Sequence, residues 1–297
     1  MQLIAETPLS SLIDRIKEQS TVILYQWLPD YIALLEQREI KEKTLSEYRR
    51  MSKFVAAKMG GYGVSAVDTR AIVSFLAEWR DSGKETMYNR YRSFLKGVFS
   101  SAISAGLTER NPVKHIKSER VTISRSCLLF PQFVTICEQA DLLYVWARST
   151  YELAQLTGQR LSDVHGMKWS DIVDGAIRIT QKKTGMKLAI DTQTKMAALG
   201  KSIADVLDEL KDLDNGSGRI VPASSTALMT NAFAKARTAT GLTWDGSPPS
   251  FHEIRSLAAR IYTEEKGPEY TQRILGHKSA QMTEKYVDSR GAEWIAI

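Results

Sequence analysis

The sequence has few cysteines and no long apolar run, and both absences exclude whole classes of protein. Its 297 residues contain only Cys127 and Cys137, without a CxxC pair, so neither a disulfide framework nor a zinc site is indicated. No stretch stays apolar for the roughly 18 residues that a membrane span needs, and Met1–Ser20 lacks the basic start and hydrophobic centre of a signal peptide. These absences predict a cytoplasmic protein that does not partner a membrane.

Sequence features of nucleotide-dependent and two-metal enzymes are missing as well. There is no Walker A motif, so ATP is not expected, and no carboxylate cluster of the kind that holds two magnesium ions. We therefore expect neither a cofactor nor a metal. The apolar fraction of 43% and the charged fraction of 25% are those of a folded protein, and a chain of 297 residues favours two domains. The net charge of +6 comes entirely from residues 1–125, which gives modest support to a nucleic-acid partner.

The stretch Ser250–Tyr286 concentrates side chains that can bind a phosphate. Ser250 is predicted to cap a helix, with Glu253 in the capping-box position, so that His252 falls in the first turn. Free N–H groups and the helix dipole favour an anion there. Arg255 follows three residues after His252, on the same side of the helix. An imidazole and a guanidinium at a helix start outline a phosphate site.

Two further residues complete a recognisable pattern. His277 stands in a Leu-Gly-His sequence, and Tyr286 follows nine residues later. Each residue alone is more often a cap, a surface charge or a packed ring. Together, His-x-x-Arg, Leu-Gly-His and the tyrosine resemble the C-terminal signature of the tyrosine recombinases, the phage integrase family. Within this family, the motifs most resemble those of the lambda-type phage integrases.

The resemblance implies a site-specific DNA recombinase for the integration and excision of a mobile element. Such an enzyme cleaves and rejoins double-stranded DNA at core-type attachment sites through a 3′-phosphotyrosine, as a homotetramer that passes through a Holliday junction. DNA-bending accessory proteins are possible partners of such an enzyme in its bacterial host cell. Two alternatives stay open at this point: a type IB topoisomerase-like nicking and rejoining enzyme, and a non-catalytic DNA-binding factor descended from an integrase.

The resemblance also implies a catalytic set that reaches beyond the C-terminal stretch. Arg160, in Thr-Gly-Gln-Arg, corresponds to the first of two phosphate-binding arginines, and Asp163 at i+3 is expected to hold its guanidinium by a charge-assisted hydrogen bond. Lys183, in a Lys-Thr-Gly turn, corresponds to the catalytic lysine, with Lys182 the neighbour most easily confused with it. The complete implied catalytic set is Arg160, Lys183, His252, Arg255, His277 and Tyr286.

The chemistry of these side chains suits strand exchange. Tyr286 has the nucleophile's hydroxyl, which needs assistance to lose its proton at neutral pH. The guanidinium groups of Arg160 and Arg255 can donate to the non-bridging phosphate oxygens, and Lys183 is the candidate acid for the departing 5′ oxygen. His252 and His277 can accept the tyrosine proton or donate to the phosphate, and the sequence leaves that division open.

The predicted fold is mainly α. Residues 1–20 form a lead-in segment, too short for the arm-binding domain with which lambda-type integrases begin; the domain is either naturally absent or truncated. Residues 21–112 are expected to form an all-α, SAM-like core-binding domain of four helices, with capping residues at Thr44 and Asp68. These helices are predicted over residues 22–37, 44–59, 68–80 and 84–105.

Basic side chains of this first part are candidates for DNA contact under the resemblance, although a solvated face is an equally good interpretation from composition alone. The candidates are Arg49, Arg50, Lys53, Arg90, Arg92, Lys96, Lys114 and Lys117. Residues 113–126 lose the helical period and gather basic charge, which predicts an interdomain linker that, in the family, completes a C-shaped clamp around the duplex.

Residues 127–297 are predicted to form an α+β catalytic domain with a small antiparallel sheet. Its hairpin joins Ala176–Thr180 to Met186–Ile190 through the turn that carries Lys183. Helices are predicted over residues 131–139, 142–156, 195–213 and 223–239. The C-terminal tail, residues 287–297, ends in an apolar segment, and the resemblance implies that it docks on a neighbouring protomer.

Overall fold

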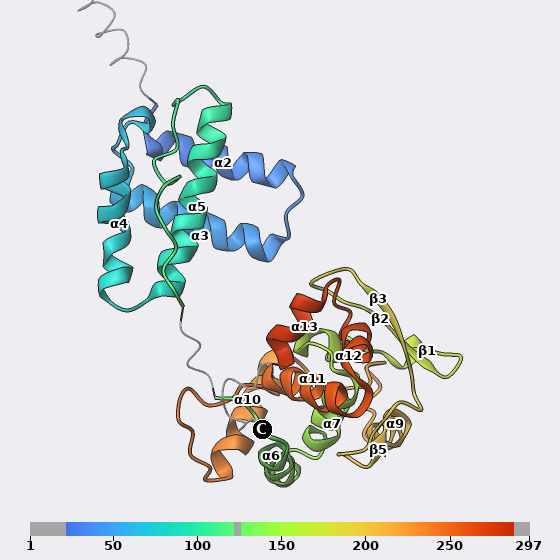
Figure 1. The fold of residues 1–297 in the computed structure, drawn as a ribbon. Helices are drawn as coiled ribbons and strands as arrows, with labels where there is room; N and C mark the ends of the chain where they lie inside the picture. The colour runs from blue at the N-terminus through green and yellow to red at the C-terminus, as the bar shows by residue number, and fades with distance from the viewer. Residues whose placement is uncertain (1–21, 122–125, 288–297) are drawn as a thin grey trace, which may run out of the picture. The chain divides into compact units, whose positions relative to one another are not determined.

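The computed structural model describes residues 22–121 and 126–287, which divide into two compact units between Ile123 and Ser124 (Figure 1). The first unit is all-helical, and the second combines helices with two small antiparallel sheets. The predicted mainly α fold, with an all-α domain ahead of an α+β domain, is confirmed. Within these ranges no helix is both long and apolar enough to cross a membrane. The predicted lead-in segment and the tail beyond Val287 lie outside the described residues.

In the described residues of the first unit, four helices pack around one apolar core. Leu28, Phe94 and Leu95 are among the side chains fully enclosed in it. Asp68 caps its third helix as predicted, because its Oδ1 accepts from the Ala71 amide at 2.8 Å. The described helices are α2 (Leu24–Gln37), α3 (Glu42–Met59), α4 (Thr69–Asp81) and α5 (Glu85–Ser104), with a short 3-10 turn η1 (Val64–Ala66) before α4.

The capping box predicted at Thr44 is wrong. Helix α3 begins at Glu42, and the Lys41 carbonyl already accepts from the Thr44 amide at 2.8 Å and from the Leu45 amide at 3.1 Å. Thr44 is therefore inside the first turn, so its hydroxyl is not in the N-cap position.

The first part of the predicted linker is packed rather than extended through solvent. Val113 and Ile116 are buried in the core of the first unit, and the Ile116 carbonyl accepts from Arg92 Nε at 2.6 Å. Asn89 on α5 exchanges two hydrogen bonds with the Glu119 backbone, at 2.8 and 2.9 Å. The prediction of a coreless connector from residue 113 is wrong up to residue 119. The helical period is lost there because a turn and an extended segment, rather than a helix, bury the apolar side chains.

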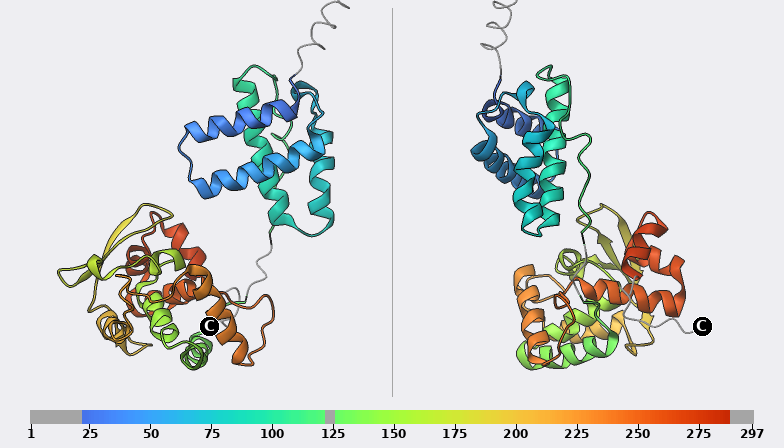
Figure 2. Two further views of the ribbon diagram at one scale, coloured as in Figure 1. Left: turned by 180° about the vertical axis from the view of Figure 1, so that it is seen from behind. Right: turned by 60° about the vertical axis from the view of Figure 1, so that its left-hand side comes forward.

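The second unit places its C-terminal helices against a β-hairpin (Figure 1, Figure 2). The predicted hairpin is present: β2 (Ala176–Thr180) pairs antiparallel with β3 (Lys187–Asp191), and β1 (Ile172–Val173) flanks β2. A second sheet pairs β4 (Lys195–Met196) with β5 (Lys201–Ser202). The helices are α6 (Phe130–Leu143), α7 (Ala147–Thr157), α8 (Leu161–Val164), α9 (Ile203–Lys211), α10 (Thr226–Ala239), α11 (Glu253–Lys266), α12 (Pro268–Leu275) and α13 (Ala280–Val287), with a 3-10 turn η2 (Trp169–Asp171).

Two predicted helix starts in this unit are wrong. Residues 195–202 form the β4–β5 pair, and helix begins only at Ile203, after Ser202 has capped it by accepting from the Asp205 amide at 3.2 Å. The turn between these strands uses Gly200 at φ +72°, a conformation that a continuous helix excludes. Helix α7 starts at Ala147 rather than Leu142, because α6 continues to Leu143.

Helix α7 is the buried axis of the second unit. All of its residues except Arg148 are buried, and it leads directly to the Gly-Gln-Arg sequence that ends at Arg160. Around it the rings of Tyr151, Phe233 and Phe251 pack edge to face, with centroids 5.4–5.9 Å apart. An almost entirely buried helix thus fixes the position of the first predicted arginine.

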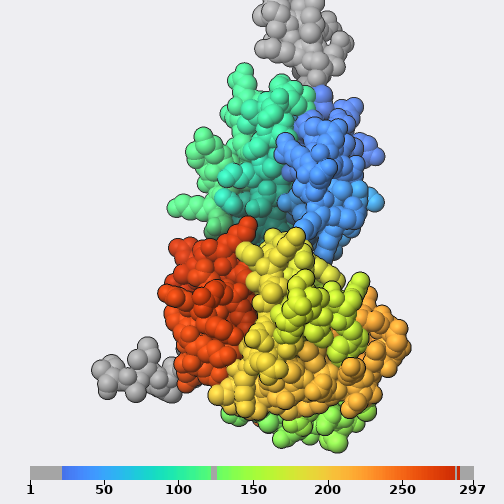
Figure 3. Space-filling view, turned by 90° about the vertical axis from the view of Figure 1, so that its right-hand side faces the viewer, coloured from blue at the N-terminus to red at the C-terminus, as the bar shows by residue number. Residues whose placement is uncertain are grey.

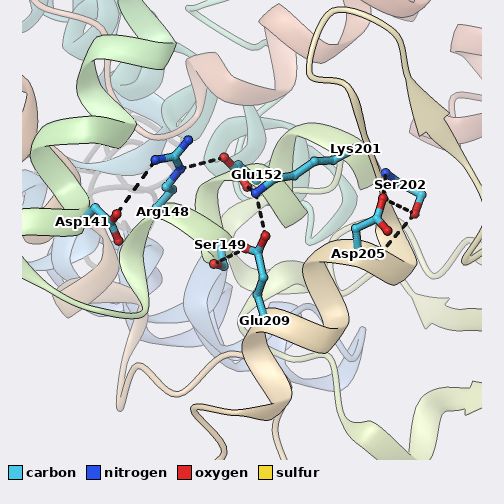
Figure 4. A network of polar contacts seen from close by, with 8 residues as sticks. All are labelled: Asp141, Arg148, Ser149, Glu152, Lys201, Ser202, Asp205 and Glu209. Carbon is cyan, nitrogen blue, oxygen red and sulfur yellow. Dashed lines mark hydrogen bonds and ion pairs between the residues drawn. The ribbon is translucent and has the colours of Figure 1, made fainter.

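A charge network joins α7 to β5 and α9 (Figure 4). The Glu152 carboxylate, only 3% exposed, accepts from Arg148 Nε at 3.0 Å and from Lys201 Nζ at 2.7 Å. Lys201 also bonds to Glu209 at 2.7 Å, and Glu209 accepts from the Ser149 hydroxyl at 2.7 Å. A buried carboxylate is costly unless it is paired in this way, so the network locks three elements together.

Candidate active site

Two left-handed glycines bring the catalytic motifs together. Helix α7 ends at Gly158 (φ +63°) and α12 ends at Gly276 (φ +64°). A Cβ at Gly158 would lie 2.8 Å from Leu275 Cδ2, and a Cβ at Gly276 would lie 2.8 Å from Gln181 Nε2. Glycine is favoured at both positions for two reasons: the backbone has a positive φ, and a Cβ would come too close to a neighbouring side chain. The two helix ends touch, and the residues that follow them, Arg160 and His277, enter one site.

Arg255 lies at the centre of this site. It is 1% exposed, and its Nη1 donates to the Gly158 carbonyl at 2.8 Å while Nη2 donates to the Leu275 carbonyl at 2.8 Å. Nη2 also contacts His277 Nε2 at 2.8 Å. Burial, and next the nearby positive charge of Arg160, lower the pKa of Arg255 to about 10. The guanidinium stays charged at neutral pH, but it has been taken out of water at a free-energy cost.

The contacts of His277 fix its tautomer. Arginine can only donate, so His277 Nε2 must accept from Arg255, and the ring proton must therefore sit on Nδ1. Nδ1 in turn lies 2.9 Å from the hydroxyl of Thr283 on α13, to which it donates. Burial, and then the positive charges of Arg255 and Arg160, lower the pKa of His277 to about 4. His277 is thus a neutral imidazole at physiological pH.

Tyr286, on α13, covers this pair of residues. Its ring centroid lies 5.1 Å from the Arg255 guanidinium carbon and 5.1 Å from the His277 ring. The centroid of the His252 ring lies 5.8 Å from that of the Tyr286 ring. The structure thus brings four of the predicted catalytic side chains into one cluster, and the tyrosine stands over buried positive charge.

The predicted cap of the α11 helix is wrong in detail. Glu253 begins the helix, His252 occupies the N-cap position, and Ser250 lies in the turn before it, where its carbonyl accepts from the Glu253 amide at 2.8 Å. His252 is exposed at this helix start. The predicted phosphate site at this helix start does not depend on the cap. The His252 imidazole still lies at the positive end of the helix dipole, three residues before buried Arg255.

The hydrogen bond predicted between Arg160 and Asp163 is wrong. Arg160 Nη1 donates to Gln181 Oε1 at 3.1 Å, whereas Asp163 Oδ1 accepts from the Lys182 amide at 2.9 Å and Oδ2 has no hydrogen-bond partner among the described residues. The i+3 argument fails because Arg160 is the extended N-cap of the single-turn helix α8, with ψ near 151°, and does not share a helical face with Asp163. Asp163 holds the hairpin turn instead.

The turn between β2 and β3 carries both candidate lysines, exposed to solvent. The ammonium group of Lys182 lies over Gly166, where an added Cβ would come within 3.2 Å of Nζ. Lys183 occupies the middle of the turn, which Gly185 closes at φ +71° with its amide donating to the Gln181 carbonyl at 2.8 Å. In the space-filling view the red C-terminal helices and the yellow segment after this turn meet on one face of the unit (Figure 3). The choice of Lys183 over Lys182 stays a prediction.

Three residues that hold the site were not predicted from the sequence. Gln159 and Gln181, each 1% exposed, bond to one another at 2.8 Å, and Thr283 bonds to His277. One signal was present in the sequence. Ile177 and Ile179 point inward on β2, so Gln181 continues the buried face of an alternating strand with a polar amide. A buried amide needs partners, which marks a polar network.

Two family models match the chain. The phage integrase family model matches residues 129–293, and the phage integrase central domain model matches residues 26–119. The integrase of Escherichia phage HK022 is 37% identical over 301 residues, which cover 100% of this chain and 84% of that protein. The chain belongs to the phage integrase family. The family and the enzyme class predicted from the sequence are confirmed: the protein is a lambda-type, tyrosine-type site-specific recombinase.

Solved structures agree with this assignment over nearly the whole chain. The crystal structure of a lambda integrase dimer bound to a COC′ core site has a TM-score of 0.90, with 36% identity over 99% of this chain and 84% of that one. The structure of a lambda integrase tetramer bound to a Holliday junction has a TM-score of 0.91, with 36% identity over 98% of this chain and 84% of that one.

The basic residues predicted to contact DNA fall into two groups. Arg49 is ion-paired with Glu36 and Glu42 at 2.7 Å each, Arg90 is paired with Glu47 at 2.9 Å, and Arg92 donates to a backbone carbonyl at 2.6 Å. Three of the eight guanidinium or ammonium groups thus have partners within the first unit. The second group consists of Arg50, Lys53, Lys96, Lys114 and Lys117, all of them exposed. Contact of either group with DNA stays a prediction.

Proposed function

We propose that Tyr286 is the nucleophile of this recombinase, that Arg160 and Arg255 bind the scissile phosphate, and that Lys183 is the acid. The observation that carries this proposal is the buried Arg255–His277 pair beneath the tyrosine ring, with contacts of 2.8 Å and 5.1 Å. Every acceptor that Arg255 contacts is neutral, so its positive charge is available to a phosphate. Such preorganised donors stabilise the charge that builds up on the phosphoryl oxygens.

The cleavage step follows from these assignments. The Tyr286 oxygen attacks phosphorus, a new P–O bond forms to the tyrosine, and the bond from phosphorus to the 5′ oxygen breaks. The 5′ oxygen takes a proton from Lys183, and the 3′ end stays attached as a phosphotyrosine. Rejoining runs the same step in reverse with the 5′ hydroxyl of another strand, so the phosphoester bond energy is conserved and no external energy source is needed.

The two histidines have different roles in this proposal. Both ring nitrogens of His277 are occupied, Nε2 by Arg255 and Nδ1 by Thr283, so His277 holds the guanidinium in place. His252 stands exposed at the start of α11 with its ring 5.8 Å from that of Tyr286. We assign to His252 the assistance in removing the tyrosine proton.

The same proposal extends to the assembly on DNA. By analogy with the lambda integrase structures, a homotetramer joins two core-type attachment sites on double-stranded DNA and exchanges strands through a Holliday junction. The two units bind the duplex together, with DNA-bending proteins as possible accessory partners. The setting is the cytoplasm of a bacterial host, where the mobile element integrates and excises.

A trapping experiment tests the assignment of the nucleophile. The substrate is a nicked duplex carrying the core site, identified as the sequence repeated at both ends of the integrated element. Tyr286→Phe is expected to bind this duplex but to form no covalent adduct, because the attacking hydroxyl is gone. Tyr270→Phe is the matched control, since Tyr270 lies on neighbouring α12 and is expected to leave adduct formation intact. An adduct with Tyr286→Phe would contradict the proposal.

A further inference from the structure

Gln159 and Gln181 form a buried amide pair whose orientation is fully determined. Gln181 Nε2 donates to Gln159 Oε1 at 2.8 Å and to the Leu275 carbonyl at 2.9 Å. Gln159 Nε2 donates to the Thr157 and Ile274 carbonyls, both at 2.8 Å. A carbonyl can only accept, so neither amide can be turned over without loss of these bonds.

The side-chain oxygen of Gln181 accepts hydrogen bonds from Arg160 and from the turn that carries Lys183. Gln181 Oε1 accepts from Arg160 Nη1 at 3.1 Å and from the Thr184 hydroxyl at 2.6 Å. Arg160 is the first phosphate-binding arginine of the proposal, and Thr184 directly follows Lys183 in the turn. Gln181 therefore uses both amide hydrogens and both oxygen lone pairs, and one side chain contacts both the arginine and the lysine turn.

The turn itself is held on each side of Lys183. Before it, the Lys182 amide donates to Asp163 at 2.9 Å. After it, the Thr184 hydroxyl bonds to the Gln181 side chain, while the Gln181 backbone closes the turn through Gly185 and Met186 at 2.8 Å each. Gln181 thus joins the Lys183 backbone to the frame on which Arg160 is placed.

The pair also reaches the second arginine through a shared acceptor. The Leu275 carbonyl accepts from Gln181 Nε2 at 2.9 Å and from Arg255 Nη2 at 2.8 Å. It belongs to the last turn of α12, where carbonyl groups have no amide of their own helix to accept from. Gly276 keeps this approach open, since a Cβ there would lie 2.8 Å from Gln181 Nε2.

We propose that Gln159 and Gln181 are positioning residues that set the Lys183 turn at a fixed place relative to Arg160 and Arg255. The inference rests on the proposed function of those three residues. A neutral amide suits the task, because a carboxylate at position 181 would offset the positive charge of Arg160, whereas an amide orients the guanidinium and leaves its charge for the phosphate. Gln159 acts through Gln181 by holding its amide group.

Single-turnover cleavage of the nicked core-site duplex tests this. Gln181→Met keeps the approximate volume but removes four hydrogen bonds. We expect cleavage to slow on the order of 100-fold, because a displacement of about 1 Å in a reacting group costs that much. The dissociation constant for the duplex should change less than about threefold, since phosphate contacts elsewhere dominate DNA affinity. Gln159→Met should show the same defect to a smaller degree.

A bridging-sulfur substrate separates positioning from simple loss of structure. A 5′ thiolate leaves without an acid, so this duplex should restore part of the Gln181→Met rate, the part that comes from a displaced Lys183. Gln181→Met combined with Lys183→Ala should be slower than Lys183→Ala by much less than the single Gln181→Met factor. Equal defects on both substrates, or fully additive effects, would overturn the proposal.

Gln132→Met is the control. Gln132 is a half-buried glutamine of the same unit, on α6, and its Oε1 accepts from the Leu129 amide at 2.9 Å, at the start of that helix. It should lower thermal stability but leave the cleavage rate of the folded protein unchanged, and an equal loss of rate would count against the proposal. Adduct formation by the wild-type protein distinguishes the two hypotheses. If the wild type forms no adduct at Tyr286, the proposed function is contradicted. If the wild type forms the adduct and Gln181→Met cleaves at the wild-type rate, only the positioning role is contradicted.

Discussion

Two buried polar networks of the second unit differ in how their charges are balanced. Around Glu152, a carboxylate meets Arg148 at 3.0 Å and Lys201 at 2.7 Å, and Lys201 meets a second carboxylate, Glu209 (Figure 4). Around Arg255, the guanidinium meets two carbonyl oxygens and a neutral imidazole, each at 2.8 Å. The first network pairs its charges in direct ion pairs. The hydrogen bonds of Arg255 instead go to neutral groups, and the Asp163 carboxylate acts on it only through space.

The difference separates a stabilising network from a binding one. A buried ion that is paired and hydrogen-bonded adds rigidity, whereas a buried arginine with neutral partners costs folding free energy until an anion arrives. The lowered pKa values of Arg255 and His277, about 10 and about 4, both reflect this burial and the crowding of positive groups. In the proposed function, the free-energy cost of burying Arg255 is recovered as affinity for the phosphate in the transition state.

Apart from the loss of the proposed nucleophile, the largest expected effect follows the loss of the proposed acid beside the Arg255 network. Lys183→Ala should slow cleavage of ordinary DNA by about 10²- to 10⁴-fold, the range for general acid catalysis, and should recover on DNA with a bridging 5′ sulfur. Single-turnover rates on the two substrates measure this. Lys182→Ala is the control, and sulfur rescue of Lys182→Ala instead would move the acid by one residue.

Arg255→Lys tests whether the buried positive charge must be held by its neutral acceptors. The ammonium keeps the charge but cannot reach the Gly158 carbonyl, the Leu275 carbonyl and His277 together, so the donor facing the phosphate is misplaced. Cleavage should fall by about 10²- to 10³-fold. A binding measurement on the same duplex distinguishes lost chemistry from lost affinity, and a rate close to wild type would show that charge alone suffices.

Lys201→Met should break the balanced network and leave catalysis intact. It leaves Glu152, whose carboxylate is 3% exposed, with Arg148 as its remaining ion pair, and removal of one partner of a buried pair costs about 3 kcal/mol or more. Urea unfolding measures the loss, with Lys211→Met, an exposed lysine on α9, as the control. A cleavage rate per folded molecule that also dropped would mean that the two networks are coupled.

The smallest effect is a dependence of stability on pH. The pKa of His277 is lower in the folded protein, about 4, than its ordinary value of 6.5, so between these values the unfolded chain binds more protons. The stability associated with the neutral imidazole is present above pH 6.5 and is lost as the pH falls towards 4. The loss is on the order of 1–2 kcal/mol after allowance for solvent screening. His277→Gln should lack this part of the pH dependence in urea unfolding, and an unchanged profile would contradict it.

The sequence predicted the residues of the site better than their contacts. His252, Arg255, His277 and Tyr286 were predicted from local motifs, because the His-x-x-Arg spacing and the Leu-Gly-His sequence are visible in one stretch. The hairpin was equally visible, since β2 alternates buried and exposed residues. Reliance on local pattern also explains the errors. Residues 195–202 were predicted to be helical, and Arg160 was predicted to share a helical face with Asp163.

Contacts between segments distant in the chain could not be predicted from the sequence. Gln181 bonds to Leu275 across 94 positions of the chain, and Arg255 bonds to Gly158 across 97. Val113 and Ile116 pack without a helical period, so the linker prediction missed them. These contacts depend on which helix ends meet in the folded unit. The local periodicity of the sequence contains no information about such meetings.

The protonation of His277 tests the central claim, a buried positive site with neutral partners, most directly. The chain has 4 histidines, so their ring nitrogens can be followed by NMR with labelled histidine, and His277→Gln assigns one of the signals. His277 is expected to be neutral at pH 7, with its proton on Nδ1, and to titrate near 4. A His277 that titrates at its ordinary value of 6.5, or carries its proton on Nε2, would show that Arg255 does not donate to it and would contradict the account.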